Sequence, residues 1–184
     1  MPNRISVGVD CGNRMGLAAV DVETEKVLLC EAVIAKSIAR GGLGEALCKA
    51  FILGADADPD EREPMKVWIE EPGGYVMQGH MAEFGVRHKT NVRSIFMIGV
   101  AAGRAAEWCA EHGVPCEFIT ATAAKEGLMG DPAASKVAVA LYLEALGYTL
   151  PQTRQGTVDH ECSDALCVAI AGARLMKQGQ ESDD

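Results

Sequence analysis

The chain has 184 residues, of which 48% are hydrophobic and 23% charged, and it carries a net charge of −9. So acidic a chain is poorly suited to coating nucleic acid nonspecifically, because that binding depends on Lys and Arg neutralising phosphates. No apolar stretch reaches the roughly 18 residues needed to cross a bilayer, and no secretory pattern opens the chain. We therefore expect one domain over residues 1–184, with a full core, an acidic tail over about 178–184 and a cytoplasmic location.

The cysteine pattern also favours the cytoplasm. Seven cysteines, an odd number, are scattered along the chain without a Cys-x-x-Cys pair. Such spacing indicates small buried side chains in a reducing compartment, and not a disulfide framework or a zinc site. They are Cys11, Cys30, Cys48, Cys109, Cys116, Cys162 and Cys167.

The first 70 residues predict four strands and one helix. Short β-branched runs indicate the strands, and apolar residues at helical spacing indicate the helix. Because short turns join the first three strands, we expect those strands to pair antiparallel. The elements are strands over 5–10, 17–22, 26–34 and 66–70 and a helix over 42–53, with a turn over 12–16 and an acidic loop over 54–65.

The rest of the chain predicts three helices and one further strand, after a long connection over 71–92. Asp131 and Pro132 form a strong helix start, since an acidic N-cap is followed by proline at the first helical position. The expected elements are a helix over 93–112 that ends at Gly113, a strand over 114–119, a helix from Asp131 to about Leu146, and a helix over about 160–177 capped by Asp159. This order predicts an α/β domain with a mixed five-stranded sheet and helices on both faces.

Acidic side chains stand at the ends of several apolar segments. Asp10 and Glu70 each end a predicted strand, where an unpaired carboxylate would be costly to desolvate. On the last helix, Glu161 and Asp164 are three residues apart and therefore share a face. We predict that these four carboxylates meet around metal ions, with His160 as an adjacent ligand or proton shuttle.

Oxygen ligands select a hard cation, so the predicted ions are Mg²⁺ or Mn²⁺. Two such ions, about 4 Å apart, can activate water and stabilise a departing 3′ oxygen during displacement at phosphorus. Simpler interpretations stand beside this one: Asp10 as a turn residue, Glu70 as a strand end with Glu71 as the functional acid, and Glu161 as favourable charge at a helix N-terminus. Asp164, isolated before an apolar run, is the hardest to explain without a function.

Three segments around these acids form a recognisable pattern. They are Val-Gly-Val-Asp10-Cys-Gly-Asn-Arg-Met-Gly, Ile-Glu70-Glu71 and Glu161-Cys-Ser-Asp164-Ala-Leu-Cys-Val-Ala. From residue 5 to about 175 the chain resembles the RuvC family of Holliday-junction resolvases, which has the ribonuclease-H-like fold. The resemblance implies that Asp10, Glu70, Glu161 and Asp164 hold two Mg²⁺ or Mn²⁺ ions. The family has Asp or His at the third position, so Glu161 is a departure and His160 stays open as an alternative.

Two lysines extend the resemblance. RuvC-like enzymes place lysines at this spacing near the scissile phosphate, which implies that role for Lys125 and Lys136. Lys136 falls in the first turn of a predicted helix, where the helix dipole disfavours a cation and favours a phosphate. The alternative is that both are ordinary solvated lysines.

A dense basic run in the connection after Glu70 predicts a strip that contacts DNA phosphates. Its candidates are Arg87, Lys89 and Arg93, and a solvated loop is the alternative. Tyr75, in the same connection, is a candidate for stacking on an unpaired base at a branch point, an effect worth about 1–3 kcal/mol.

The expected activity is nicking of four-way or other branched DNA by a homodimer, in a bacterium or one of its viruses. Surplus apolar residues on the helix over 93–112 predict the dimer interface that the resemblance implies. No residue pattern points to a helicase partner. Two alternatives remain. One is an ATPase lobe of the actin and sugar-kinase type, because Asp10, Gly12 and Gly16 also suit its phosphate-binding turn. The other is a junction-binding protein that does not cleave.

Overall fold

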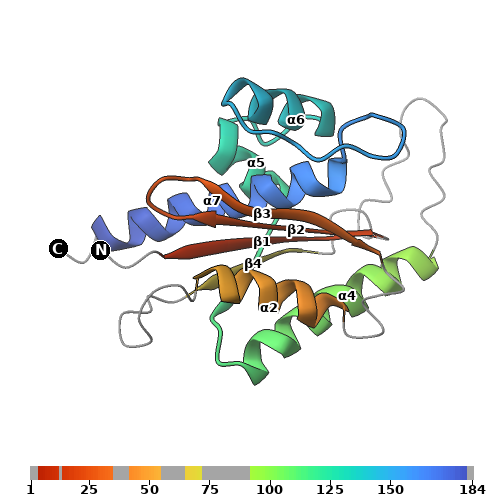
Figure 1. Cartoon of the computed structure of the whole chain (residues 1–184), viewed down its shortest axis with the longest axis vertical. Helices are drawn as coiled ribbons and strands as arrows, with labels where there is room; N and C mark the ends of the chain where they lie inside the picture. Colours follow the sequence, from red (N-terminus) through yellow and green to blue (C-terminus); the bar gives the residue numbers. More distant parts are fainter. Residues whose placement is uncertain (1–3, 13, 35–41, 55–64, 72–91, 182–184) are drawn as a thin grey trace.

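A mixed sheet lies at the centre of the molecule, with helices on both faces (Figure 1). The computed structural model describes residues 4–12, 14–34, 42–54, 65–71 and 92–181. Within these ranges the sheet has five strands in the order β3-β2-β1-β4-β5. The elements are β1 (Ile5–Cys11), β2 (Arg14–Asp21), β3 (Val27–Ile34), α2 (Gly42–Gly54), β4 (Lys66–Glu70), α4 (Val92–Glu111), β5 (Cys116–Ile119), α5 (Ala121–Met129), α6 (Lys136–Ala145) and α7 (His160–Glu181).

The strand pairing confirms the predicted mixed sheet. β1, β2 and β3 form an antiparallel meander, as expected from their short turns. β4 pairs parallel with β1 on its other side, and β5 pairs parallel with β4. Since the carboxyl ends of β1 and β4 lie at the same edge of the sheet, their last residues are neighbours.

Alternation along the strands divides the core into two layers. Val9 and Ile69 belong to the layer beneath α2 and α4, whereas Trp68 belongs to the layer with α5, α6 and α7. Ser6 also faces α7, since its hydroxyl donates a hydrogen bond to the Ala169 carbonyl at 2.7 Å. The same alternation turns Asp10 and Glu70 toward α7.

Glycines allow α7 to lie almost directly on the sheet. A Cβ atom at Gly8 would come within 2.2 Å of the Ala165 carbonyl oxygen, and one at Gly16 within 1.9 Å of the Glu161 carbonyl oxygen. Farther along the helix, a Cβ atom at Gly172 would come within 2.2 Å of the Trp68 ring. No larger residue fits at these three points without moving the helix.

Two helices differ from the prediction. α5 was not predicted, because the segment after Thr120 contains mostly small residues; the Thr120 side chain caps it by accepting a hydrogen bond from the Ala123 N–H at 3.1 Å. α6 starts later than the predicted Asp131. The Asp131 carboxylate accepts a hydrogen bond from the Ala133 N–H within a turn, and Ser135 is the N-cap of the helix.

The remaining boundaries shift by a few residues. β2 begins at Arg14, so it includes part of the predicted turn, and α7 continues to Glu181. In the described part of the chain, no helix combines the length and apolar character that a bilayer crossing requires.

Candidate active site

Four carboxylates come together where β1 and β4 end beneath the first turn of α7. Asp10 lies near the end of β1 and Glu70 at the end of β4, next to each other because Val9 pairs with Ile69. Glu161 and Asp164 lie at the start of α7, one helical turn apart. Asp10 and Asp164 are both buried, with only 7% and 8% of their surface exposed.

Burial and mutual repulsion dominate the electrostatics of this cluster. Burial, followed by the negative charges of Glu70 and Asp164, raises the pKa of Asp10 to about 9. Burial and the charge of Asp164 raise the pKa of Glu70 to about 6. The carboxylates are therefore close enough to oppose one another's ionisation, and a cation among them would remove that opposition.

One oxygen of the cluster lacks a partner. The Oδ2 atom of Asp10 is buried and makes no hydrogen bond within the described residues. A buried polar atom normally has a partner, so such an exception calls for an explanation. A hard divalent cation fits, because its preferred ligands are carboxylate oxygens. In the described ranges, no three acidic, His or Cys side chains are already arranged as a metal-binding group.

Lys136 provides a cation inside the cluster. Its Nζ atom reaches from the start of α6 to form an ion pair with Asp164 Oδ2. Burial opposes the charge of this lysine, but the hydrogen bond and the attraction of Asp164 outweigh it and raise the pKa of Lys136. The charge of Lys125, on α5, acts to lower the pKa of Glu70. Both predicted lysines thus lie beside the acids.

Glu161 extends over the turn that follows β1. A Cβ atom on Gly12 would lie 3.2 Å from Glu161 Oε2, and the charge of Glu161 contributes to the raised pKa of Asp10. Its neighbour His160 is half-buried, and its Nδ1 atom has no hydrogen-bond partner among the described residues. Glu71 is exposed, and its backbone N–H donates to the Ile119 carbonyl, so Glu70 is the acid within the cluster.

Two thiols near the cluster have raised pKa values. Burial and the charges of Asp164 and Glu70 raise the pKa of Cys167 to about 12. Burial and the charge of Asp10 likewise raise the pKa of Cys11. Both shifts favour the neutral thiol over the thiolate that binds metal.

One ion pair beside the cluster was not predicted. Arg14, the first residue of β2, donates from Nη2 to Asp159 Oδ2 at 2.5 Å. The sequence suggested Asp159 only as a helix cap. The two partners of this ion pair are 145 residues apart in the chain, so no local sequence pattern pointed to the pair.

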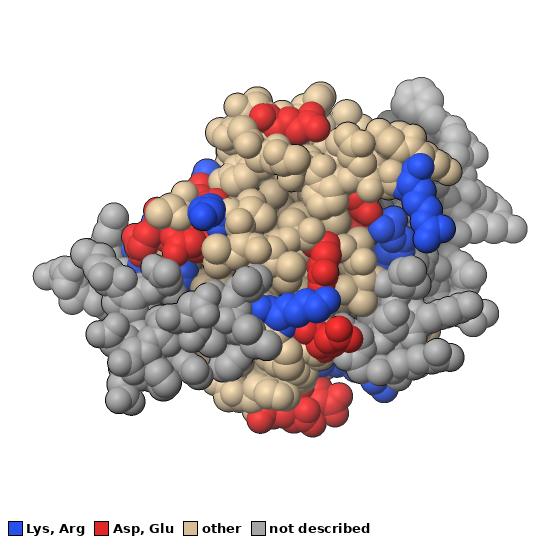
Figure 2. Space-filling view, viewed as in Figure 1, with Lys and Arg blue, Asp and Glu red and all other residues tan. Residues whose placement is uncertain are grey.

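The predicted DNA strip falls mainly outside the described residues. Tyr75, Arg87 and Lys89 lie there, as does the side chain of Arg93. On the face shown in Figure 2, the described Lys and Arg side chains form small separate groups near acidic ones, and no basic strip crosses it.

Comparisons with known proteins bear on the fold. No protein-family model matches the sequence, and a search of curated proteins gives no match. Among solved structures, Thermus thermophilus RuvC matches with a TM-score of 0.63 and 24% identity over 95% of this chain and 96% of that one. This chain has the RuvC fold.

A second match is T. thermophilus RuvC in complex with a Holliday junction substrate, with a TM-score of 0.62 and 22% identity over 96% of both chains. The RuvC fold is ribonuclease-H-like, so the predicted fold class is confirmed.

Proposed function

We propose that this protein is a divalent-metal-dependent endonuclease that nicks branched DNA and resolves four-way junctions. The observation that carries the proposal is the buried Asp10 Oδ2 atom, which has no partner among the described residues. Asp10 lies at one edge of a RuvC-type sheet, among carboxylates that raise its pKa. That a RuvC of this fold was solved with a Holliday junction supports the choice of substrate.

In this proposal, Asp10, Glu70, Glu161 and Asp164 hold two Mg²⁺ or Mn²⁺ ions, with His160 as an alternative to Glu161. When bound, the ions supply an activated water and stabilise the leaving 3′ oxygen, so that hydrolysis leaves a 5′ phosphate. The electrostatics favour loading, because cations stabilise the ionised carboxylates that burial and repulsion oppose.

Lys136 and Lys125 bind the scissile phosphate in this proposal. The charge of Lys136 neutralises Asp164 while the cluster lacks other cations, and its Nζ becomes available to a phosphate once Asp164 has a different partner. Tyr75, Arg87, Lys89 and Arg93 are proposed DNA contacts on the strength of the sequence alone.

Homodimer formation through α4 is part of the proposal. Phe96, Met97 and Val100 are exposed by 68%, 37% and 36%, which is unusual for one helix face in a monomer. A Phe96→Glu variant should sediment as a monomer. Leu141→Glu, at a 60% exposed position on α6, is the matched control and should leave the dimer intact. The proposed setting is the bacterial cytoplasm, for a bacterial or viral protein.

The test of the activity uses a labelled four-way junction and linear duplex of the same sequence, each with Mg²⁺ or Mn²⁺. The wild-type protein should give paired nicks in the junction, and the Asp164→Asn variant should bind the junction without cutting it. Binding without cleavage by the wild-type protein would indicate a non-cleaving junction-binding protein. ATP turnover without nicking would indicate the ATPase alternative.

A further inference from the structure

Arg14 and Asp159 join two parts of the molecule that carry the acidic cluster. Arg14 begins β2, directly after the turn that follows Asp10, and Asp159 immediately precedes α7. The ion pair between Arg14 Nη2 and Asp159 Oδ2 is 2.5 Å long, and the Asp159 side chain is only 7% exposed. An acid so buried requires a cationic partner, because desolvating an unpaired carboxylate is costly.

The backbone of Asp159 fixes the start of the helix. Its carbonyl accepts the hydrogen bond from the Ser163 N–H, and its own N–H donates to the Pro151 carbonyl. The position of Asp159 therefore sets the position of the first turn, which carries Glu161 and Asp164. Arg14 holds that position from the sheet side.

A second contact ties the same strand to the same turn. Gly16, two residues after Arg14, lies so close to the Glu161 backbone that no Cβ atom fits between them. Residues two apart on a strand face the same side, so Arg14 and Gly16 both act on the first turn of α7. Gly16 sets how closely the turn approaches, and Arg14 resists its displacement along the sheet.

We propose that Arg14 is a positioning residue for the metal ligands: its ion pair with Asp159 holds the first turn of α7 over the end of β1. This inference rests on the proposed function, because it assumes that the cluster binds metal.

The experiment measures Mn²⁺ affinity by calorimetry, without DNA, for Arg14→Gln, Asp159→Asn and the double variant. Residues that orient metal ligands typically change affinity by about 10- to 100-fold, so each single variant should bind Mn²⁺ at least about tenfold more weakly. Since both singles break the same pair, the double variant should be no weaker than the weaker single. Arg14→Lys, which keeps the charge, should recover part of the affinity.

A matched control comes from the other end of α7. Arg174 and Glu25 form an Arg–carboxylate pair of similar chemistry, so Arg174→Gln should lower thermal stability while leaving Mn²⁺ affinity unchanged. Hydrogen exchange gives a second readout. Arg14→Gln should speed exchange of the amides in the first turn of α7, whereas Arg174→Gln should not.

The outcomes separate this inference from the proposed function. If the wild-type protein cuts junctions but Arg14→Gln binds Mn²⁺ normally and loses only junction affinity, Arg14 is a phosphate contact and the positioning role is wrong. Additive losses in the double variant, or an equal loss in Arg174→Gln, would also overturn it. A wild-type protein that binds Mn²⁺ but leaves junctions intact overturns the function alone, and one that binds no Mn²⁺ overturns both.

Discussion

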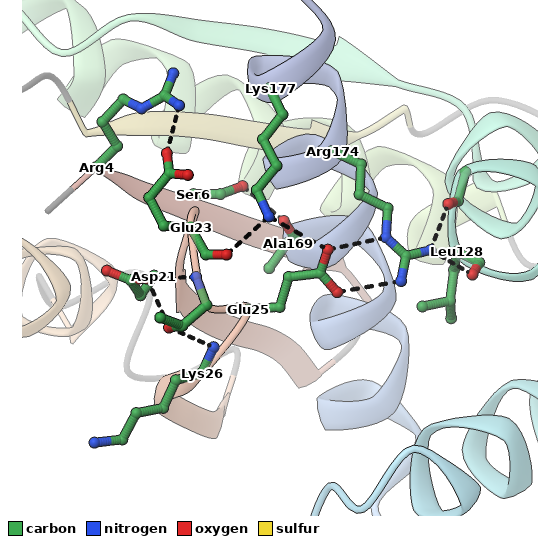
Figure 3. A network of polar contacts seen from close by, with 12 residues as sticks. Arg4, Ser6, Asp21, Glu23, Glu25, Lys26, Leu128, Ala169, Arg174 and Lys177 are labelled. Atoms are coloured by element: carbon green, nitrogen blue, oxygen red, sulfur yellow. Dashed lines mark hydrogen bonds and ion pairs between the residues drawn. The ribbon is translucent and has the colours of Figure 1, made fainter. Parts of the chain in front are cut away.

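The two ends of α7 differ in how completely their charged side chains are paired. At the C-terminal end, Arg174 forms a two-pronged pair with Glu25 and also donates to two carbonyls at the end of α5 (Figure 3). Lys177 and Arg4 bond to Glu23 in the same network. At the N-terminal end, four acids lie near one another and Asp10 and Asp164 are buried, but only Lys136 is paired with them, and Asp10 Oδ2 has no partner among the described residues.

The difference indicates what each end does. The paired charges near Arg174 fasten the helix to the β2–β3 hairpin and to α5, so that end serves stability. An excess of buried acid lowers stability unless a ligand compensates for it, and proteins tolerate such departures mainly at functional sites. The N-terminal end is therefore the one where chemistry is expected.

The strongest test of this contrast is Asp10→Asn. If the acids bind catalytic metal, junction cleavage should fall by about a thousandfold or more, because a metal ligand is lost. The metal-free protein should nevertheless unfold at a higher temperature, because the wild-type protein must protonate Asp10 in order to fold, whereas the neutral amide needs no proton. Single-turnover cleavage and calorimetry check both parts. A drop in metal-free stability would contradict the proposed excess of charge.

Gly16→Ala tests the close seating of the helix. Its Cβ would meet the Glu161 carbonyl at 1.9 Å, so the helix must shift and the free energy of unfolding should fall by about 3 kcal/mol. Gly179→Ala, near the C-terminal end of the same helix, is the control, because a Cβ there meets nothing within 4 Å. Urea unfolding of both variants should show a loss only for the first.

Arg174→Gln tests the C-terminal end. Losing the pair with Glu25 and the bonds to α5 should reduce the free energy of unfolding by about 2 kcal/mol, since these bonds involve charged groups and are partly buried. Cleavage at saturating metal should stay at the wild-type rate. A large loss of cleavage would show that the two ends of the helix are not independent.

The most gradual effect is a pH dependence of the metal-free protein. Because the folded-state pKa of Asp10 is raised to about 9, the folded protein keeps a proton that the unfolded chain loses at much lower pH. Stability should therefore fall as pH rises from about 5 to 9, by up to about 1 kcal/mol per pH unit, relative to Asp10→Asn. Thermal unfolding in EDTA measures this pH-dependent difference in stability between the wild-type protein and Asp10→Asn, and saturating Mn²⁺ should remove the pH dependence.

The sequence predicted features that depend on local pattern. Strand and helix periodicity placed the sheet, and acids at the ends of strands identified the cluster. α5 was missed because only Ala124 and Leu128 are buried within it, too few to produce a clear apolar period. The sequence predicted Asp131 as the N-cap of the next helix, but its side chain closes a turn with the Ala133 N–H. Ser135 is the N-cap because it lies one turn closer to the buried residues of α6.

Other features arise only in three dimensions. The need for glycine at positions 8 and 16 comes from the backbone of a helix encoded some 150 residues later. The Arg14–Asp159 pair has the same origin, and neither partner is unusual in its own stretch of sequence. Pairing across such distances has no local signal.

The place of Trp68 gives the protein an internal optical reporter. Trp68 lies on β4, two residues before Glu70. Its indole is buried against α7 at Gly172. Emission from this ring should respond when cations enter the cluster and α7 adjusts. Trp108, the second of two tryptophans in the chain, lies in α4 on the opposite side of the sheet, stacks on His112 just after that helix, and supplies a steady reference. Fluorescence titration can therefore follow ion loading in the unmodified chain, without a label.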